Sequence, residues 1–313
     1  MTCFLTLFMI QLRRCILQLK TDIVIYKVNL YEVREMFINS DWHIHSEASY
    51  DGTLSLEELV EKAKLYKFKK IGITDHVNYN DSEFLADLRQ SAEDVNKMQK
   101  TYPDIVLGAE LTPIEKPLFD YIAKTGTREG YVPPMSSKPY DMELAVTKEE
   151  MVALGVRYAI GASHWRVDVP NAQTLALDID ATIREWYRQQ MWLACDERVT
   201  ILGHPWFNGD AAWYEDFSVI PRSMNMDIAA ALKENKKYVE YNRCMLLSPQ
   251  CSEKFRIQYA EFMRELFEMG IPMTFGSDAH GVYSGSHLEM EKYLTSVGFK
   301  EGDFTEIAEK DLW

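Results

Sequence analysis

Cysteine is scarce in this sequence and provides no framework for a disulfide-stabilised fold. The chain of 313 residues contains five cysteines, an odd number, and no two of them form a Cys-x-x-Cys pair. Disulfide-rich secreted domains and cysteine-bound zinc sites both depend on paired, regularly spaced cysteines. The cysteine content therefore argues against both classes and indicates a protein of the reducing cytoplasm.

Positive charge is also in short supply. Lysine and arginine number 34 against 48 acidic residues, and the formal net charge is -14. Binding to a nucleic-acid backbone depends on Lys and Arg neutralising phosphates, so we expect no nucleic-acid partner. A small phosphorylated substrate is not excluded, because a few cations in one pocket suffice to bind it.

Long apolar runs of membrane-spanning length are missing at the N-terminus. The run CFLTLFMI falls far short of the roughly 20 residues that a spanning helix needs. Arg13 and Arg14 follow this run, whereas a signal peptide carries its positive charges before the apolar core. We expect no membrane association. We interpret residues 1–35 as an accessory extension and residues 36–313 as one domain.

Internal repeats, low-complexity tracts and Pro/Gly/Ser-rich linkers are absent too, and what is present is an alternation of two kinds of segment. Seven short apolar segments, each ended by Gly, Asp or His, have the character of strands. They are MFINSDWHIH, KKIGITDH, DIVLGAEL, VRYAIGASH, RVTILGHP, KYVEYNR and IPMTFGSDAH. Helical periodicity lies between them, so we predict parallel β/α units closed, or nearly closed, into a barrel.

The helical segments carry recognisable start signals. Ser55-Leu56-Glu57-Glu58 is a capping box, which predicts a helix over LEELVEKAKLYK. One stretch departs from the alternation. Residues 112–150 contain YVPPMSSKPY, and we expect a long loop there with one short helix near TKEEMVALG, a candidate lid or substrate loop.

Histidines gather at the carboxyl ends of the predicted strands. Six of the seven histidines lie there, and only His287 falls inside a predicted helix. In a β/α barrel all these ends meet at one face, which is the face that carries active sites. The residues concerned, with the acids beside them, are His43, His45, Asp51, Asp75, His76, Glu110, His164, His204, Asp278 and His280.

Any one of these histidines alone would more often be a hydrogen-bonded loop residue than a ligand. Their joint placement is harder to explain in that way. Carboxylates crowded into one pocket repel one another unless a cation lies among them. Imidazole combined with carboxylate suits Zn, Mn or Fe better than Ca. The residues therefore predict a cluster of divalent metal ions at the barrel mouth.

The ordered set HIHSEASYDG, ITDH, GAE, ASH, GHP and GSDAH resembles the PHP (polymerase and histidinol phosphatase) superfamily. The resemblance covers residues 37 to about 281. It implies an α/β fold, a distorted (βα)7 barrel of the PHP type. It also implies a trinuclear site holding three divalent metal ions per chain, with Zn, Mn and Fe as the candidates.

The same resemblance implies nine ligands. Glu110 would bridge the first two metals, and Asp51 stands where some members have His, which bears on metal preference. Glu110, Asp278 and His280 are the expected catalytic residues. The implied ligands are His43, His45, Glu110 and Asp278 for the first metal, Glu110, His164 and His204 for the second, and Asp51, His76 and His280 for the third.

The implied function is a metal-dependent phosphoesterase that hydrolyses a small phosphate monoester, in the manner of histidinol phosphatase. A metal-bound hydroxide would be the nucleophile, and the sequence contains no G-x-S-x-G, P-loop or H-E-x-x-H motif that would favour another. Arg166 and Arg243 follow predicted strand ends and could bind the substrate phosphate. The alternative for each is a surface salt bridge.

Three other functions compete with this interpretation. One is a PHP-type nuclease or exonuclease acting on nucleic-acid ends, which the acidic composition disfavours. Another is a carbon–nitrogen hydrolase of the amidohydrolase type, which would carry a bridging lysine at the fourth strand, where this chain has His164. The third is a non-catalytic metal-binding regulator, which a full set of ligand-capable residues makes less attractive.

Overall fold

A computed structural model of the chain describes residues 38–167, 178–207, 212–283 and 287–313. The proposed extension, residues 1–35, lies outside the described residues. Within the described part of the chain, no helix combines the length and apolar character needed to cross a membrane.

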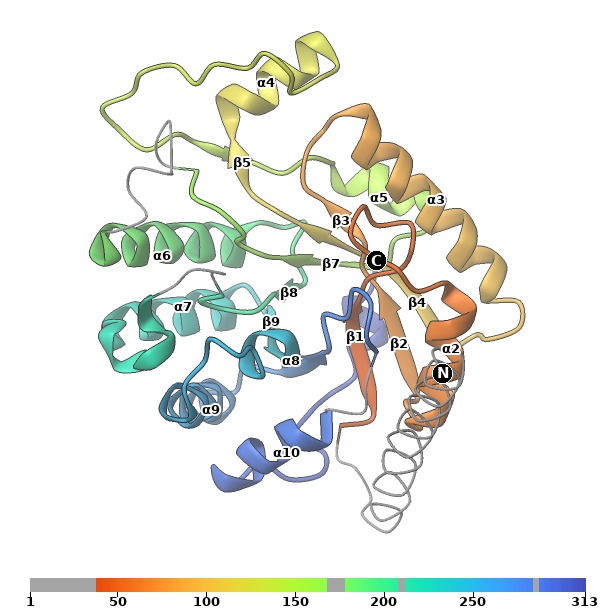
Figure 1. The fold of residues 1–313 in the computed structure, drawn as a ribbon, viewed down its shortest axis with the longest axis vertical. Coiled ribbons are helices and arrows are strands. Elements are labelled where there is room, and N and C mark those ends of the chain that lie inside the picture. The colour runs from red at the N-terminus through yellow and green to blue at the C-terminus, as the bar shows by residue number, and fades with distance from the viewer. Residues whose placement is uncertain (1–37, 168–177, 208–211, 284–286) are drawn as a thin grey trace, which may run out of the picture. The chain divides into compact units, whose positions relative to one another are not determined.

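Seven parallel strands form a nearly closed barrel (Figure 1). Each of the seven predicted strand segments supplies one, and the KKIGITDH segment continues into a further short strand that also pairs with β4. The predicted fold class is confirmed. In the order in which they follow one another around the barrel, the strands are β1 (Ser40–Ile44), β2 (Lys70–Ile73), β4 (Ile105–Leu111), β7 (Tyr158–Gly161), β8 (Ile201–Leu202), β9 (Tyr238–Asn242) and β10 (Met273–Gly276), and β3 (His76–Val77) lies beside β4.

The barrel closes between β1 and β10 through few backbone contacts and one buried side chain. The regular ladder is reduced here to a single bridge between Ile44 and Ala279. The Asp41 carboxylate supplements it, because its Oδ1 accepts the backbone N–H of Ser277 at 2.9 Å. The next residue, Asp278, donates its N–H to the carbonyl oxygen of His43 at 2.8 Å. This seam therefore sets the ends of β1 and β10 side by side.

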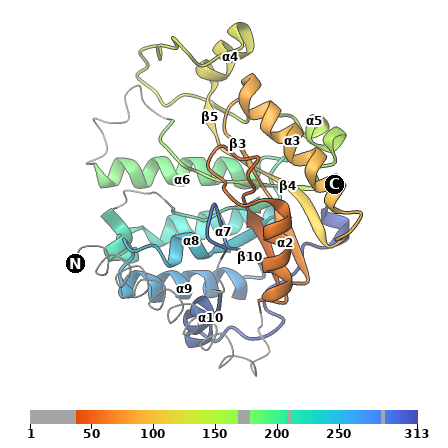
Figure 2. The same cartoon turned by 45° about the vertical axis from the view of Figure 1, so that its right-hand side comes forward.

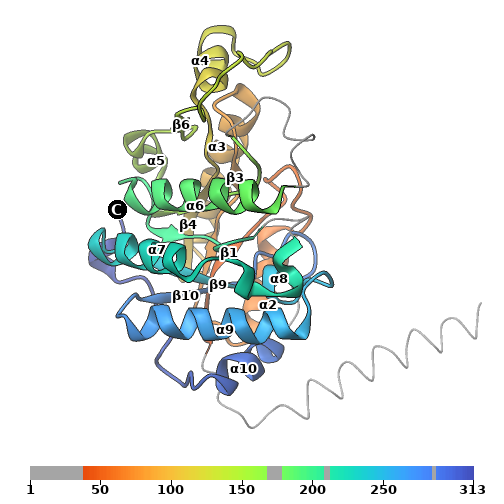
Figure 3. The same ribbon diagram turned by 90° about the vertical axis from the view of Figure 1, so that its left-hand side faces the viewer.

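Helices cover the outside of the barrel. The Ser55 capping box forms as predicted, with the Glu58 side chain returning to the Ser55 backbone, and Figures 2 and 3 show α6, α7 and α9 lying next to one another. The covering helices are α2 (Leu56–Leu65), α3 (Ser82–Met98), α6 (Ile179–Cys195), α7 (Arg222–Glu234), α8 (Arg243–Leu246), α9 (Glu253–Glu268) and α10 (His287–Ser296), with short 3-10 turns at Ala212–Glu215, Phe217–Val219 and Glu309–Asp311.

The prediction for residues 112–150 was incomplete. The expected short helix exists as α5 (Lys148–Leu154), but a second helix, α4 (Lys116–Thr125), and the antiparallel strands β5 (Ile114–Glu115) and β6 (Met142–Glu143) also form. Helix α4 lies at the periphery of the fold (Figure 1). The sequence carried two signals for α4, a proline in its first turn and Gly126 at its end. In the structure Gly126 adopts the left-handed conformation with φ of 80°.

The C-terminal segment packs against the amino-terminal end of the barrel interior. Ile307 is only 2% exposed, and the following residue, Ala308, donates its N–H to the Tyr238 hydroxyl at 3.0 Å. Tyr158 fills the interior beside it, and a Cβ on Gly72 would lie 1.8 Å from the Tyr158 hydroxyl oxygen. The buried cluster comprises Trp42, Tyr158, Ile160, Ile201, Tyr238 and Ile307.

Because Ile307 fills this cluster, Ile307→Ala should lower the free energy of unfolding by about 2–5 kcal/mol, the usual cost of truncating a buried isoleucine. Urea unfolding of the purified protein measures this. Val132→Ala is the matched control, since Val132 is 81% exposed and its truncation should cost less than about 0.5 kcal/mol. Equal effects of the two substitutions would show that the C-terminal segment does not support the barrel.

Candidate metal centre

The structure brings all nine predicted ligands together at the carboxyl ends of the strands. His43 lies in β1 and Glu110 in β4, and both side chains are fully buried. Asp51 and His280 lie on loops and are the most exposed members, with side chains 32% and 31% exposed. The cluster is therefore closed on the barrel side and open on the side of the β1 and β10 loops.

The first group has the dimensions of a metal site. His43 Nε2 and His45 Nε2 lie 3.1 Å apart, and Glu110 Oε2 lies 3.4 Å from each. Asp278 Oδ1 lies 3.6 Å from His43 Nε2 and 3.3 Å from His45 Nε2. Ligands bound tetrahedrally at about 2.0–2.1 Å stand about 3.3–3.4 Å apart. Glu110 Oε2 and Asp278 Oδ1 therefore each stand at ligand-like separations from the two imidazole nitrogens.

A second group shares the same glutamate. Glu110 Oε1 lies 3.3 Å from His164 Nε2 and 3.1 Å from His204 Nε2. The two carboxylate oxygens of Glu110 thus face two different sets of imidazoles. A carboxylate placed in this way can bridge two cations.

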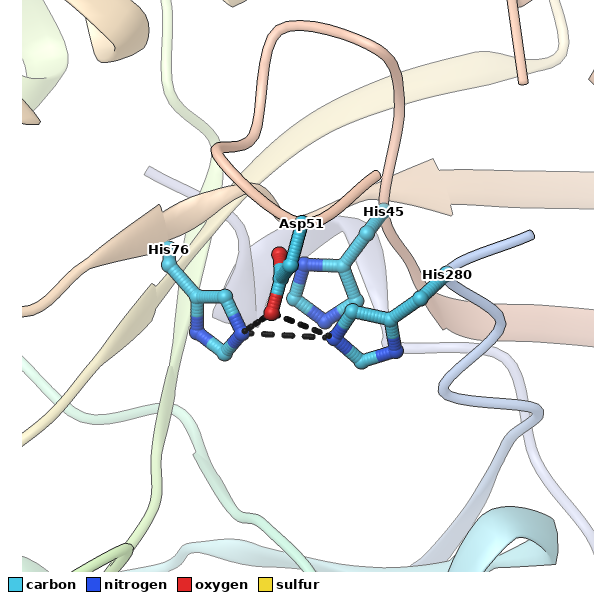
Figure 4. A group of neighbouring side chains, drawn as sticks. All are labelled: His45, Asp51, His76 and His280. Atoms are coloured by element: carbon cyan, nitrogen blue, oxygen red, sulfur yellow. Dashed lines mark hydrogen bonds and ion pairs between the residues drawn. The ribbon is translucent and has the colours of Figure 1, made fainter. Parts of the chain in front are cut away.

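The third group forms a nearly equilateral triangle. Asp51 Oδ2 lies 3.4 Å from both His76 Nε2 and His280 Nε2, and the two nitrogens are 3.3 Å apart. Figure 4 shows the three side chains turned toward one another with the His45 ring beside them. Three ligands at tetrahedral separation leave a further coordination position open, as catalytic zinc sites do.

Some residues belong to more than one group. When a group is defined as a set of ligand atoms that all lie within 4.8 Å of one another, the groups differ from those that the family resemblance implies. His76 in particular also places its Nδ1 2.8 Å from Glu110 Oε2. The sets found by distance are His45, Asp51, His76 and His280, then His43, His45 and Asp278, and then His76, Glu110 and His164.

Hydrogen bonds orient two of the rings so that Nε2 faces the cluster. His43 Nδ1 lies 2.7 Å from Glu240 Oε1, and His280 Nδ1 lies 3.1 Å from the carbonyl oxygen of Asp278. A carboxylate and a carbonyl oxygen only accept, so each Nδ1 carries a proton, and on a neutral ring each Nε2 would present its lone pair to a cation.

The same logic applies to His164. Its Nδ1 lies 2.8 Å from the Thr112 hydroxyl, which donates its single proton to Asn78 Oδ1 at 2.6 Å. The hydroxyl therefore accepts from His164 Nδ1, which leaves Nε2 free for a cation.

The electrostatics of the cluster also favour cations. Burial by itself would raise the pKa of Glu110, but His43, His76 and His164 hold that pKa well below its usual range. Burial, together with the neighbouring His76, lowers the pKa of His45 to about 3. For His76, burial would lower the pKa, yet Glu110 and Asp51 raise it to about 10. The carboxylates thus stay ionised and attract positive charge to this point.

Four polar residues around the cluster were not predicted from the sequence. They are Asn78, Thr112, Glu240 and Asn242. Glu240 is the most informative, because it is an acid inside the apolar strand segment KYVEYNR and is only 1% exposed. An acidic residue at that position, with Asn242 two residues later on the same face, was the signal available.

The two predicted phosphate-binding arginines lie near the barrel mouth but in different settings. Arg166 follows β7, and its Nη1 lies 3.4 Å from the Thr182 hydroxyl on α6. Arg243 is the first residue of α8, directly after β9. Their role in binding phosphate stays a prediction.

Aromatic side chains line part of the cluster. The Tyr50 ring is 60% exposed, with its centroid 5.4 Å from that of His76. Trp165 stacks on Tyr79 at 5.5 Å and an interplanar angle of 13°. Trp206, two residues after His204, is instead fully buried. Its Nε1–H donates to Asn225 at 2.9 Å, so it belongs to the core.

The chain thus forms a nearly closed parallel barrel with histidines and acids gathered at its carboxyl face, and comparisons with known proteins identify its family. The PHP domain model matches residues 41–244, well over half of the chain. The chain therefore belongs to the PHP domain family. A search of curated proteins finds no match.

A solved structure has the same fold. Histidinol phosphate phosphatase from Lactococcus lactis, complexed with zinc, L-histidinol and phosphate, superposes with a TM-score of 0.62 at 16% sequence identity. The match covers 88% of this chain and 98% of that one. The ochratoxinase of A. niger matches with a TM-score of only 0.40 at 12% identity, over 83% of this chain and 66% of that one, too weak a likeness to inform the site.

The ligand spacing predicts that the purified protein carries two to three equivalents of Zn, Mn or Fe per chain. Glu110→Gln should lose the most metal of any single ligand substitution, because it removes the charge that faces two groups. Elemental analysis measures both. Glu115→Gln, in β5 and outside the cluster, is the control and should keep the full complement. Less than about one equivalent in the supplemented wild type would contradict the site.

Proposed function

We propose that this protein is a metal-dependent phosphoesterase that hydrolyses a small phosphate monoester. The observation that carries the proposal is the convergence of three ligand groups with Glu110 at their centre, at separations that suit divalent ions. In this proposal three ions of Zn, Mn or Fe are held. His43, His45, Glu110 and Asp278 bind the first, Glu110, His164 and His204 the second, and Asp51, His76 and His280 the third.

Divalent ions held in this way would lower the pKa of bound water and stabilise the charge on a transferring phosphoryl group. The chain's own residues provide the geometry for this chemistry. Glu110 holds two groups at a fixed separation through its two oxygens. Asp278 Oδ2 accepts a hydrogen bond from Asn242 Nδ2 at 3.2 Å, which leaves Oδ1 turned toward the histidines.

Substrate would enter on the exposed side, between Asp51 and His280. Since these are the most exposed side chains of the cluster, the leaving alcohol would also depart on this side. Glu110, Asp278 and His280 are the proposed catalytic residues and would act through the ions that they hold. Arg166 and Arg243 would hold the phosphate oxygens. Tyr50 and Trp165 would flank the organic part of the substrate.

The relative from Lactococcus lactis supports a phosphate monoester as the substrate class, because its structure contains zinc, L-histidinol and phosphate. Histidinol phosphate is accordingly one candidate substrate for this chain.

The three cysteines in the described residues, Cys195, Cys244 and Cys251, are all free thiols, which supports the proposed cytoplasmic location.

The function predicts that the metal-loaded protein releases orthophosphate from members of a phosphomonoester panel that includes L-histidinol phosphate. Arg166→Ala and Arg243→Ala should each lower kcat/KM by about one to two powers of ten. That loss corresponds to about 1.5–3 kcal/mol for a charge-assisted contact to phosphate. Both variants should keep their full metal content.

Two variants make this test specific. His164→Ala should lose metal as well as activity, because it removes a proposed ligand. Arg222→Ala should change neither, since Arg222 is 72% exposed and pairs with Glu265 on the outer surface. A fully metallated protein that hydrolyses none of the monoesters would refute the function. Full activity in both arginine variants would refute only the phosphate-binding role.

We also propose that residues 36–313 form the complete catalytic domain. Deletion of residues 1–35 should then leave kcat/KM within a few-fold of the full chain, because no proposed ligand lies in that segment. The same phosphate-release assay measures this, with circular dichroism as the check on folding. Loss of folding in the shortened chain would show that the domain boundary is wrong.

A further inference from the structure

Glu240 is a buried acid in the barrel interior that lies outside the proposed ligand set. It belongs to β9 and is 1% exposed. Its Oε1 lies 2.7 Å from His43 Nδ1, and its Oε2 accepts the backbone N–H of His204 at 2.7 Å and an N–H of Asn242 at 3.1 Å. Both oxygens are therefore engaged by residues that belong to, or support, the proposed metal cluster.

We propose that Glu240 is a positioning residue that orients His43 and His204 together and thereby couples the first and second metal positions. This inference rests on the proposed function. It adds a residue that touches neither metal nor substrate and acts through two of the ligands.

The first step is the tautomer of His43. The Glu240 carboxylate already accepts from the N–H groups of His204 and Asn242, and its contact with His43 is completed when the Nδ1 of His43 donates. The Nε2 lone pair is then directed toward Glu110 Oε2 and Asp278 Oδ1, which lie 3.4 and 3.6 Å away. Histidine ligands whose other nitrogen donates to a carboxylate are also more basic toward a metal ion.

The second step is the backbone of His204. This residue has φ of 22°, in the left-handed region that non-glycine residues adopt only at a cost. Its N–H bond to Glu240 Oε2 offsets that cost. The bond also fixes the direction in which the ring leaves the chain and so keeps His204 Nε2 3.1 Å from Glu110 Oε1.

Asn242 extends the arrangement to Asp278. The Asn242 Oδ1 accepts the backbone N–H of Met245 at 2.8 Å, so its Nδ2 must face the carboxylates. One Nδ2 serves both Glu240 Oε2 and Asp278 Oδ2. The strand β9 therefore supports three proposed ligands through two adjacent side chains on one face.

Gly276 makes the reach of Glu240 possible. Strand β10 lies between β9 and β1, so the Glu240 side chain crosses β10 to meet His43. A Cβ on Gly276 would lie 1.7 Å from Glu240 Oε1 and 2.7 Å from His43 Cβ. No side chain fits at this position while the contact between Glu240 and His43 exists.

The decisive substitution is Glu240→Gln, which keeps the size of the side chain. Its amide oxygen can still accept from His204 N–H, and the amide nitrogen then faces His43 Nδ1 and donates to it. The proton of His43 moves to Nε2, the atom that should bind metal. With zinc as the probe, chelator competition should show two of three ions held about 10–100-fold more weakly. The ion assigned to Asp51, His76 and His280 should be retained.

A second readout follows the ring itself. Nitrogen-15 spectra of the zinc-loaded wild type should show His43 protonated at Nδ1 and coordinated through Nε2, a signature that Glu240→Gln should lose. Gly276→Ala should reproduce the loss by displacing Glu240 without changing its charge. Asp303→Asn, which alters a buried carboxylate bonded to the Lys300 N–H at 3.0 Å, should keep all three ions.

The outcomes separate the two proposals. If wild type and Glu240→Gln hold three zinc ions with equal affinity and the same His43 signature, the role of Glu240 is refuted and the phosphoesterase proposal stands. If the wild type holds none of zinc, manganese and iron, the proposed function fails and the coupling role falls with it. Selective weakening of two ions in both Glu240→Gln and Gly276→Ala, with Asp303→Asn unchanged, supports the inference.

Discussion

The structure depends on one buried carboxylate, that of Glu110. It is fully buried, and an ionised group in such a place is tolerated only when it is surrounded by partners of opposite charge or strong donors. The barrel supplies them from several directions, because Oε1 faces His164 and His204 while Oε2 faces His43, His45 and His76. The five rings come from four strands, because His43 and His45 both stand at the end of β1, so the convergence requires the curvature of the whole sheet.

The proposed ligands also lie across the seam between β1 and β10, where the barrel closes through few backbone contacts. The regular ladder there is a single bridge, supported by the buried Asp41 carboxylate. His43 and Asp278 lie on opposite sides of this seam, and cations held between them would tie the two strands together. In the proposed function, metal binding would therefore contribute directly to the stability of the fold.

Access to the cluster is asymmetric. The barrel side is closed by fully buried rings, whereas Asp51 and His280 are about one-third exposed. Tyr50 and Trp165 border this region, and the polar groups behind the cluster, Thr112 and Glu240, orient rings without facing the open side. In the proposed function, the orientation of the rings and the access of the substrate would therefore depend on different sets of residues.

Much of this could be predicted from the sequence, because the signals are local. Short apolar segments that alternate with segments of helical period predict the seven strands, and the Ser55 capping box predicts α2. Ligand-capable residues at successive strand ends predict that these side chains converge, because the ends of parallel strands meet at one edge. The PHP motifs predict the partition of the nine ligands among three ions. Distances place those residues together, and their role as ligands stays a prediction.

Other features exist only through partners that are remote in sequence. The strands β5 and β6 pair across the intervening α4, and Ile307 becomes a core residue only because the C-terminal segment returns to the barrel interior. Glu240 is informative only once His43 is seen beside it, across a strand whose Gly276 leaves the room. The sequence by itself determined which residue types stand at the strand ends, since hydrophobic period and turn chemistry act between neighbours. The tertiary structure alone decided which polar group faces which ring, because hydrogen bonds depend on positions that only the closed barrel sets.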